Sequence, residues 1–575
     1  MKRSVMNMTP AGRPGALLLV LCLLILPKGA GATEMGAGQV RAAVTTWVRQ
    51  ISADARSDAV IESLEPYRQD GRTVAYIAHL SGGGFCLCGA DDLVLPVYLY
   101  NPHAEYDPQI PDYDFVLWEI GTRLTSLREG LAQRDPAILQ YQDLLSGRVS
   151  LWQNLIAGQA PPRWEWSKET RTAPDSMKLI FTPQWHQGSP YNDLCPELDP
   201  GNNSEVPVGC VATAMVQIMY HWQWPNSGVG ADTVWYNRRW ETNWISEPLT
   251  TDPGIPAGYA GRLQWTATAG GQLEMNGRWD ISVYEAAWQI SNNTNYRTAL
   301  FTLYNRLNSN TTTCPANFGA TSYNWSVLGD TVGEPPDPGA SEAAEISYQA
   351  GVAVDMSYGT WGSAASTGDV PGALTDHFRY DPDGVYSVRG TKSASTMVEE
   401  IQWLRPLEMR GCRPTGGCHA WVCYGYNKIP ATWEFLMNMG WGPATSRVWY
   451  TLDSAWLGFT LNQYHATRLA PLDVIQFVGA ADLGDGSPDD PYRDLAEAAV
   501  EAPDNATLIF KAGSDNTFSG PLTVDRPLTL IGHEASIHSS KSGLASEPVQ
   551  METQQKIDGK VKEGSRPLEQ RRKTP

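Results

Sequence analysis

The stretch that decides the fold reads Pro207-Val208-Gly209-Cys210-Val211-Ala212-Thr213-Ala214-Met215-Val216-Gln217-Ile218-Met219-Tyr220-His221-Trp222. Its apolar residues recur at spacings of four, three and four, which predicts a helix with one buried stripe: Val211, Met215, Ile218 and Trp222. The proline and glycine in front suit a loop, so Cys210 lies in the first turn. There the unpaired backbone N–H groups and the helix dipole favour a thiolate. Cys210 is therefore a candidate nucleophile, with a small buried core residue as the alternative.

The composition sets the class of protein. The chain has 575 residues, which is enough for more than one domain and a sizeable core. A hydrophobic content of 42% is typical of a globular protein. The formal net charge of -19 argues against nucleic acid as the main partner.

The N-terminus has the pattern of a secretory signal peptide over residues 1–32. Basic residues precede an apolar run from Ala16 to Leu26, and Ala30-Gly31-Ala32 has the small-x-small form of a cleavage site. The apolar run is too short to anchor the chain in a bilayer. We therefore expect export from the cell and no membrane span once the signal is removed.

The nine cysteines leave the disulfide pattern open. Cys22 leaves with the signal peptide, and Cys86 and Cys88 share one face of a strand but lie too far apart for an easy bridge. Besides Cys210 five cysteines remain: Cys195, Cys314, Cys412, Cys418 and Cys423. An oxidising compartment allows disulfides among these five, and their odd number leaves at least one of them unpaired. The last three do not form C-x-x-C pairs, so neither a zinc site nor another cofactor is expected.

The N-terminal unit, residues 33–175, is predicted to mix helices and strands. We expect helices at Val40–Ile51, Phe115–Gln133 and Ala137–Asn154, and strands at Thr73–Leu80, Phe85–Cys88 and Leu93–Tyr100. The polar run Ser167–Asp175 follows Pro161-Pro162 and resembles an exposed linker that a protease can cut.

The second unit, residues 176–470, places its helix first and its sheet later, which is the α+β order. Its expected strands include Trp421–Tyr426, Trp433–Asn438 and Arg447–Leu452. In residues 471–540 a short helix, Leu495–Val500, precedes three short strands whose spacing suggests one coil of a parallel β-helix: Thr507–Lys511, Gly520–Thr523 and Leu528–Ile531. Residues 541–575 are polar and aperiodic, and we expect them to be disordered.

A thiolate nucleophile needs a histidine base and a group that orients it. His221 lies on the same helix as Cys210, three turns away, and cannot reach it. His419 follows Gly416-Gly417-Cys418 and begins a predicted strand, where the imidazole would face a cleft; a plain surface histidine is the alternative.

Two further positions complete a candidate site. Asn438 with Trp441 offers an amide for the imidazole N–H and a ring that shields this hydrogen bond from water. Gln187 offers an amide N–H beside the nucleophile for an oxyanion hole. The alternatives are a glycine-aromatic turn and a surface glutamine. The order Gln, Cys, His, Asn with Trp is that of the papain type.

These residues resemble the streptopain-type cysteine peptidases of bacteria. The similarity runs through residues 180 to 470 and is carried by Gln187-Gly188-x-Pro190-Tyr191-Asn192, Gly209–Ala214, Tyr323-Asn324-Trp325, Val354-Asp355-Met356-x-Tyr358-Gly359, Gly362-Ser363-Ala364, Gly417-x-His419-Ala420 and Asn438-x-Gly440-Trp441-Gly442. Residues 70 to 100 are similar to the inhibitory propeptide of this family.

The resemblance implies an α+β, papain-like peptidase domain behind an inhibitory propeptide. It assigns Cys210 as nucleophile, His419 as general base and acid, Gln187 as oxyanion donor, and Asn438 with Trp441 as the support of the histidine. The loop from Gly362 through Ser363 and Ala364 to Ser366 is expected to line the substrate cleft. The sequence departs from the family at Cys418, Met439, Pro443, Cys86 and Cys88.

We therefore expect a secreted bacterial cysteine endopeptidase, extracellular, periplasmic or at the cell surface. It would act on protein or peptide substrates and be held inactive by its own propeptide until the linker near 165–178 is cut. One alternative is a catalytically weakened relative that serves as a binding or adhesive module, and another is an acyl transferase with the same machinery. Side-chain preference, natural substrate, maturation bond, oligomeric state and the role of residues 471–575 stay open.

Overall fold

The structure is a computed structural model with a mixed α+β fold. It describes residues 33–139, 142–160, 174–196, 205–237, 242–245, 263–267, 272–275, 278–282, 311–358, 362–388, 393–412, 418–429, 432–452, 461–471, 474–480, 482–518, 528–532, 535–539 and 549–551. The predicted signal peptide, residues 1–32, lies outside this range, as does the predicted strand Gly520–Thr523.

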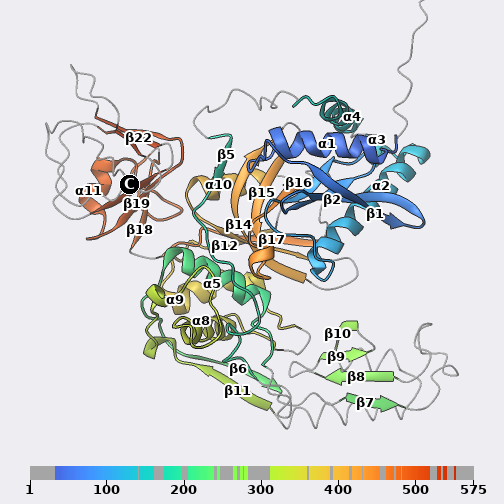
Figure 1. Cartoon of the computed structure of the whole chain (residues 1–575). Coiled ribbons are helices and arrows are strands. Elements are labelled where there is room, and N and C mark those ends of the chain that lie inside the picture. Colours follow the sequence, from blue (N-terminus) through green and yellow to red (C-terminus); the bar gives the residue numbers. More distant parts are fainter. Residues whose placement is uncertain are drawn as a thin grey trace, which may run out of the picture.

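The N-terminal module, residues 33–160, packs helices against an antiparallel sheet (Figure 1). Its elements are α1 (Ala37–Gln50), β1 (Ile61–Gln69), β2 (Arg72–Leu80), β3 (Phe85–Gly89), β4 (Val97–Asn101), α2 (Pro111–Gln133), α3 (Pro136–Leu139) and α4 (Gln142–Ile156). The predicted helices and strands match these elements, but the strand expected at Leu93–Tyr100 begins only at Val97, because Leu93 and Val94 donate to Asp91 in a turn. The sequence did not reveal β1, an edge strand that contains Pro66.

The central module, residues 174–471, contains the Cys210 helix and most of the sheet. Its helical elements are α5 (Cys210–Trp222), α8 (Ala340–Ala353), α9 (Val370–Phe378), α10 (Ser393–Gln402), and the 3-10 turns η2 (Phe318–Ala320), η3 (Trp325–Val327), η4 (Thr367–Asp369) and η5 (Pro443–Thr445). Its strands are β5 (Ser176–Lys178), β6 (Asp232–Asn237), β7 (Thr242–Ile245), β8 (Leu263–Ala267), β9 (Gln272–Met275), β10 (Arg278–Ser282), β11 (Thr311–Ala316), β12 (Val385–Val388), β13 (Leu407–Cys412), β14 (Cys418–Lys428), β15 (Trp433–Asn438), β16 (Val448–Leu452) and β17 (Leu461–Thr467).

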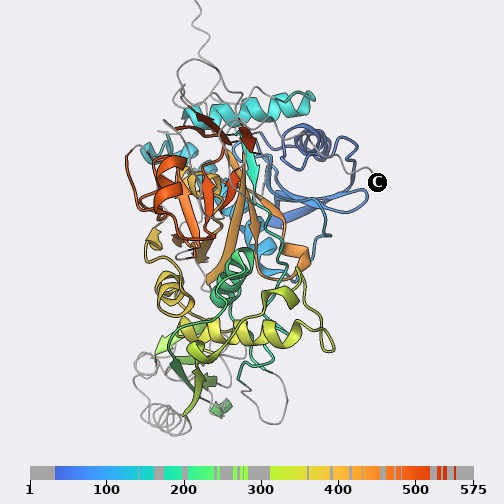
Figure 2. The ribbon, with the colours of Figure 1, turned by 90° about the vertical axis from the view of Figure 1, so that its left-hand side faces the viewer.

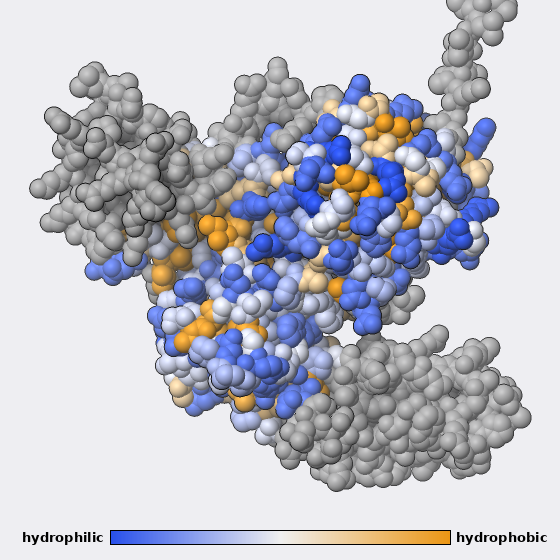
Figure 3. Space-filling model, in the orientation of Figure 1, coloured by the Kyte–Doolittle hydropathy of each residue, from blue (hydrophilic) through white to orange (hydrophobic). Residues whose placement is uncertain are grey.

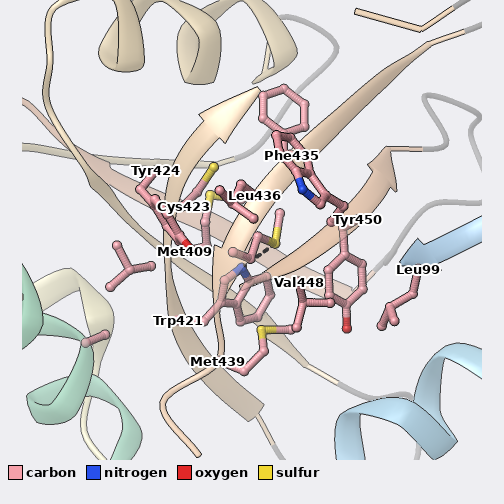
Figure 4. Close-up of a cluster of buried hydrophobic side chains, with 14 of the residues drawn as sticks. Leu99, Met409, Trp421, Cys423, Tyr424, Phe435, Leu436, Met439, Val448 and Tyr450 are labelled. Carbon is pink, nitrogen blue, oxygen red and sulfur yellow. Dashed lines mark hydrogen bonds between the residues drawn. The ribbon is translucent and has the colours of Figure 1, made fainter. Parts of the chain in front are cut away.

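One large sheet joins the two modules. Among the described strands its order is β1-β2-β3-β4-β16-β15-β14-β13-β17-β12, with β5 paired to β14. The junction is the antiparallel pair β4–β16, where Tyr100 faces Trp449 and Leu99 faces Tyr450. Leu99 and Tyr450 both border the apolar cluster of Figure 4. The N-terminal module is therefore built into the sheet of the central module through backbone pairing and shared core packing.

Helix α5 lies against β14 and α8 (Figures 1 and 2). The predicted single buried stripe is wrong for this helix, because every residue from Val211 to Met219 is buried. Packing of the sheet on one side and of α8 on another encloses the helix. The few polar residues within it, such as Thr213 and Gln217, are buried too.

The segment that leads into the central module corrects one prediction. Residues 176–178 form β5 and pair with β14, with Tyr426 opposite Met177. The Lys178 ammonium also lies 2.8 Å from the Asp54 carboxylate. A strand held in a sheet is a poor protease substrate, so an exposed linker cannot extend over 165–178 and has to end before Ser176.

The C-terminal module, residues 474–551, lies on the side of the central sheet away from the N-terminal module (Figure 1). Its elements are β18 (Ile475–Val478), α11 (Leu495–Glu501), β19 (Thr507–Phe510), β20 (Asp515–Phe518), β21 (Thr529–Gly532), β22 (Ala535–Ser539) and β23 (Val549–Met551). The pairs β18–β19, β19–β21 and β20–β22 are parallel. The β-helix stays a prediction. The expected disorder of 541–575 is wrong at 549–551, because β23 pairs antiparallel with β22.

The visible face of the N-terminal and central modules is largely hydrophilic, with smaller apolar patches between polar residues (Figure 3). Large side chains such as Trp47, Trp152 and Trp185 are buried instead. Within the described residues, no helix is long and apolar enough to span a bilayer.

Candidate active site

The backbone at Gly209 sets the position of Cys210. Gly209 has φ +97°, in the region that favours glycine. A Cβ at this position would lie 2.6 Å from Cε of Met356 and 3.0 Å from the carbonyl oxygen of Ser363. No larger residue fits here without moving both neighbours. The chain therefore enters α5 by a route that only glycine permits, and Cys210 becomes the first residue of the helix.

The structure brings Cys210 and His419 together. His419 is the second residue of β14, as predicted for a strand start, and its imidazole is hydrogen-bonded to the Cys210 thiol. Burial by itself raises the pKa of this thiol. The hydrogen bond and the charge of His419, with the backbone N–H groups of Ala420 and Val211, outweigh burial and lower the pKa below its ordinary value. The Cys210 thiolate is therefore more stable here than that of an ordinary cysteine.

The second ring nitrogen of His419 is held by a backbone atom. Its Nε2 lies 2.7 Å from the carbonyl oxygen of Met439. Because a carbonyl oxygen can only accept, Nε2 carries a proton, and Nδ1 is the nitrogen left for the thiol. This arrangement fixes the tautomer that a general base next to a thiol requires.

The side chain of Asn438 makes other hydrogen bonds than the predicted one to the imidazole. Its amide nitrogen donates to the carbonyl of Pro183 over 2.6 Å and to the side-chain oxygen of Gln217 on α5. Its amide oxygen accepts from the N–H of Gly440 over 3.0 Å. Asn438 is fully buried and fastens the loop after β15 to α5 and to the 183–187 segment. The expected hydrogen bond to the imidazole is made by the Met439 carbonyl because this loop turns the backbone toward His419.

Two indole rings lie nearly parallel to the imidazole. The Trp441 ring is 5.2 Å from that of His419 with an interplanar angle of 17°, and the Trp421 ring is 6.1 Å away with an angle of 22°. Trp441 was predicted at the site, and 39% of it is exposed. Trp421 was missed, although its spacing of two from His419 puts both on one face of β14. The Trp421 indole is buried in the cluster of Figure 4 and donates to the Met437 sulfur.

Gln187 is buried beside the nucleophile loop. Its carbonyl accepts from the N–H of Val208 over 3.0 Å, which ties it to the residues just before Cys210. Its side-chain nitrogen is buried and has no hydrogen-bond partner among the described residues. An unpaired buried donor costs about 1–3 kcal/mol, and such groups mark functional sites. The amide is therefore available for a negatively charged oxygen.

The loop predicted to line the substrate cleft lies against the entrance to α5. The Ser363 hydroxyl donates to the Pro207 carbonyl over 2.5 Å. Ala364 pairs with Ser357 through two backbone hydrogen bonds. Gly362 and Ala364 are exposed, whereas Ser363 is buried. These contacts place the loop next to Gly209 and leave two of its three predicted residues accessible.

A buried acid, Glu408 on β13, was missed by sequence reasoning. Burial raises its pKa well above the ordinary value, and the negative charge of Cys210 acts in the same direction. A neutral carboxyl does not compete with the thiolate for the imidazolium. No sequence signal distinguishes this glutamate from a surface one, because only the packing of η4 and α5 against β13 buries it.

The structure shows the surroundings of several residues at which the sequence departs from the streptopain-type peptidases. Cys418 forms a disulfide with Cys412. Met439 is buried, and its carbonyl rather than its side chain faces His419. Cys86 and Cys88 are buried free thiols in β3. In the described part of the chain no group of three or more His, Cys, Asp or Glu residues could hold a metal ion.

Part of the chain is similar to known proteins. Residues 185–253 and 294–450 match the model of the Peptidase C10 family. The chain is 24% identical over 297 residues to the thiol protease/hemagglutinin PrtT of Porphyromonas gingivalis, covering 49% of this chain and 26% of that protein. The chain thus spans about a quarter of the length of this curated relative.

Two solved structures of interpain A from Prevotella intermedia are also similar. The prointerpain A fragment shares 18% identity at a TM-score of 0.41, covering 70% of this chain and 97% of that one. The active cysteine protease shares 22% at a TM-score of 0.34, covering 51% and 95%. The family match rests on the segments that contain Gln187, Cys210, His419 and Asn438. Residues 185–253 and 294–450 of this chain are therefore similar to the Peptidase C10 family.

Proposed function

We propose that this chain is an exported cysteine endopeptidase that is made as an inactive precursor. The observation that carries the proposal is the hydrogen bond between the Cys210 thiol and the His419 imidazole. The two residues are 209 positions apart in the chain and meet where α5 abuts β14. Export is supported by the signal-peptide pattern of residues 1–32 and by the disulfide.

The proposed reaction follows the geometry of the site. The Cys210 thiolate attacks the scissile carbonyl, and the side-chain N–H of Gln187 with the backbone N–H of Cys210 stabilises the oxyanion. His419 then gives its proton to the nitrogen of the scissile bond; the C–N bond breaks, the amine leaves, and the acyl group stays on Cys210 as a thioester. A water molecule, deprotonated by His419, attacks the thioester and releases the acid. The Met439 carbonyl and the Trp441 ring hold the imidazole during both proton transfers.

The N-terminal module is proposed to act as the inhibitory prosegment. It is joined to the central sheet by the β4–β16 pair and by three side-chain hydrogen bonds. Trp47 donates to Glu434 over 2.9 Å, Trp449 donates to Asp54 over 2.7 Å, and Asn101 donates to the Ala444 carbonyl over 2.7 Å. Ala444 belongs to η5, three residues after Trp441, so the module holds the loop that carries this tryptophan. Maturation would require a cut between 160 and 176 and then release of these contacts.

Two variants test the proposal. Cys210→Ala is expected to abolish both peptide hydrolysis and self-processing, because no other described residue offers a thiolate beside His419. Stoichiometric labelling of the wild type at Cys210 by a thiol-reactive peptide inhibitor is expected as well. A purified Cys210→Ala protein that matures alone, or labelling no faster than that of a plain thiol, would refute the assignment and favour a binding module.

A further inference from the structure

We propose that the Cys412–Cys418 disulfide positions His419, so that the enzyme needs an oxidised pair at 412 and 418 together with a reduced Cys210. This inference rests on the proposed role of His419 as the base. It concerns how the base is held, which neither the family match nor the sequence motifs address.

The first step is the weak support of β14 at its beginning. β15 pairs with β14 only from Val422 onward, where Val422 faces Asn438. β5 pairs further along, from Gly425. Among the described strands, His419 and Ala420 therefore pair with β13 alone, opposite Gly411 and Arg410. A strand end that pairs with a single neighbouring strand is expected to fray.

The disulfide closes this strand end. Cys412 and Cys418 face each other in the β13–β14 ladder, in the position next to the pair Gly411–His419. Because neighbouring residues of a strand point to opposite faces, the disulfide lies on the face away from the imidazole. It therefore fixes the backbone of residue 419 without occupying the space in which the imidazole meets Cys210.

A polar and aromatic cluster borders the disulfide on that reverse face. Arg410 places a guanidinium nitrogen 3.5 Å from the Cys418 sulfur. The same guanidinium lies 5.7 Å from the centroid of the Tyr464 ring and donates to the Tyr386 hydroxyl over 3.4 Å. These contacts orient the Cys418 end of the disulfide. Cys418 itself is exposed, which leaves the bond open to small thiols.

The reaction would therefore require an oxidised pair at Cys412 and Cys418 and, at the same time, a reduced thiol at Cys210. Two molecules of a small thiol such as glutathione would reduce the disulfide, giving two protein thiols and one glutathione disulfide. The backbone at 418–420 would then lose its covalent closure. Two of the groups that stabilise the Cys210 thiolate, the His419 imidazole and the Ala420 N–H, lie on this stretch. Under strongly oxidising conditions, oxidation of Cys210 itself would stop the reaction.

The test compares the double variant Cys412→Ser/Cys418→Ser with the wild type, each as the full chain that is allowed to mature. We expect kcat to fall by about tenfold to a hundredfold with little change in KM, because misplacing a base affects the transition state more than substrate binding. We also expect the midpoint of the pH profile of Cys210 alkylation by iodoacetamide to move toward that of a plain thiol. A purely structural disulfide would leave this profile unchanged. Equal kcat and equal profiles in the two proteins would overturn the inference.

Two controls make the result specific. Cys314→Ala removes a buried free thiol far along the chain from the catalytic pair and is expected to leave kcat and the alkylation profile unchanged. If the double variant fails to fold, the wild type is incubated in graded glutathione buffers, and the reduced fraction of Cys412 and Cys418 is measured by mass spectrometry. Activity should fall as this fraction rises, and full activity of the fully reduced protein would also overturn the inference.

The experiment separates this inference from the proposed function. A wild type that hydrolyses no peptide would count against the peptidase. The alkylation profile of Cys210 would still show whether the disulfide holds His419 beside the thiol, since it requires no substrate.

Discussion

The imidazole of His419 donates to the backbone carbonyl of Met439, with 2.7 Å between Nε2 and the oxygen. The group that orients the His419 imidazole is thus a backbone carbonyl oxygen, which every amino acid possesses. Its place depends on the loop that follows β15, where the Met439 N–H donates to the Thr445 carbonyl over 3.0 Å. The identity of side chain 439 should therefore matter less than the shape of this loop.

Substitution of Met439 tests this relationship. Met439→Leu keeps the volume of a buried side chain, which costs less than about 1.5 kcal/mol of stability, and it keeps the carbonyl in place. We expect kcat/KM to stay within a few-fold of the wild-type value, measured with a fluorogenic peptide. A large loss of kcat without a loss of folding would show that the side chain itself supports the base.

Substitution of Asn438 should be more damaging than substitution of Met439, although none of the described hydrogen bonds joins Asn438 to His419. Asn438→Ala leaves the buried acceptors of Pro183 and Gln217 without their donor, at a cost of about 1–3 kcal/mol. The loop that carries Met439 and Trp441 also loses its link to α5. We expect a lower melting temperature together with a lower kcat. A variant that loses activity at unchanged stability would point to a direct role for the amide.

Substitution of Gln187 should lower the activity without lowering the stability of the protein. Because its buried amide nitrogen has no partner among the described residues, Gln187→Ala is expected to leave the melting temperature unchanged or slightly higher. Loss of an oxyanion donor should lower kcat by about 10²–10³-fold with little effect on KM. Gln184→Ala, three residues earlier, is the matched control and should be close to wild type. Equal kcat in both variants would remove Gln187 from the oxyanion hole.

Sequence patterns predicted where Cys210 and His419 lie in their elements, because both residues are at element boundaries. Cys210 begins α5 and His419 is second in β14, and glycines in front of both gave a readable signal. The partner of the imidazole was not predictable in the same way. A side-chain amide can be recognised as a residue type, whereas the carbonyl of Met439 depends on how a loop turns.

The fold was predicted where one sequence pattern determined one element. Strand β2 and helix α1 follow from local periodicity. The pairing of β4 with β16 joins residues about 350 positions apart and leaves no local pattern, so the continuous sheet was not foreseen. The Cys412–Cys418 pair also depends on strand register, which the cysteine count left open.

The contact between the N-terminal module and the central sheet should depend on pH through Glu434. Burial raises the pKa of Glu434 to about 7, against the hydrogen bonds from Asn427 and Trp47. An acid whose pKa is raised in the folded state contributes stability that is complete below its ordinary pKa and is lost as pH rises toward 7. We therefore expect the contact to weaken between about pH 4.5 and pH 7, by at most about 3 kcal/mol.

Thermal unfolding in the inactive background measures this effect. The melting temperature of Cys210→Ala is expected to fall over that pH interval more steeply than that of Cys210→Ala/Glu434→Gln, whose amide cannot ionise. Parallel curves for the two proteins would show that Glu434 does not couple the contact to pH.

The pairing of Cys210 with His419 is tested most directly by the pH dependence of Cys210 alkylation in the wild type and in His419→Ala. In the wild type we expect rapid labelling with a midpoint below the ordinary thiol pKa, because His419 stabilises the thiolate. In His419→Ala the midpoint should move upward, since burial then acts without the opposing imidazolium. Identical profiles for the two proteins would contradict the pairing on which the proposed chemistry depends.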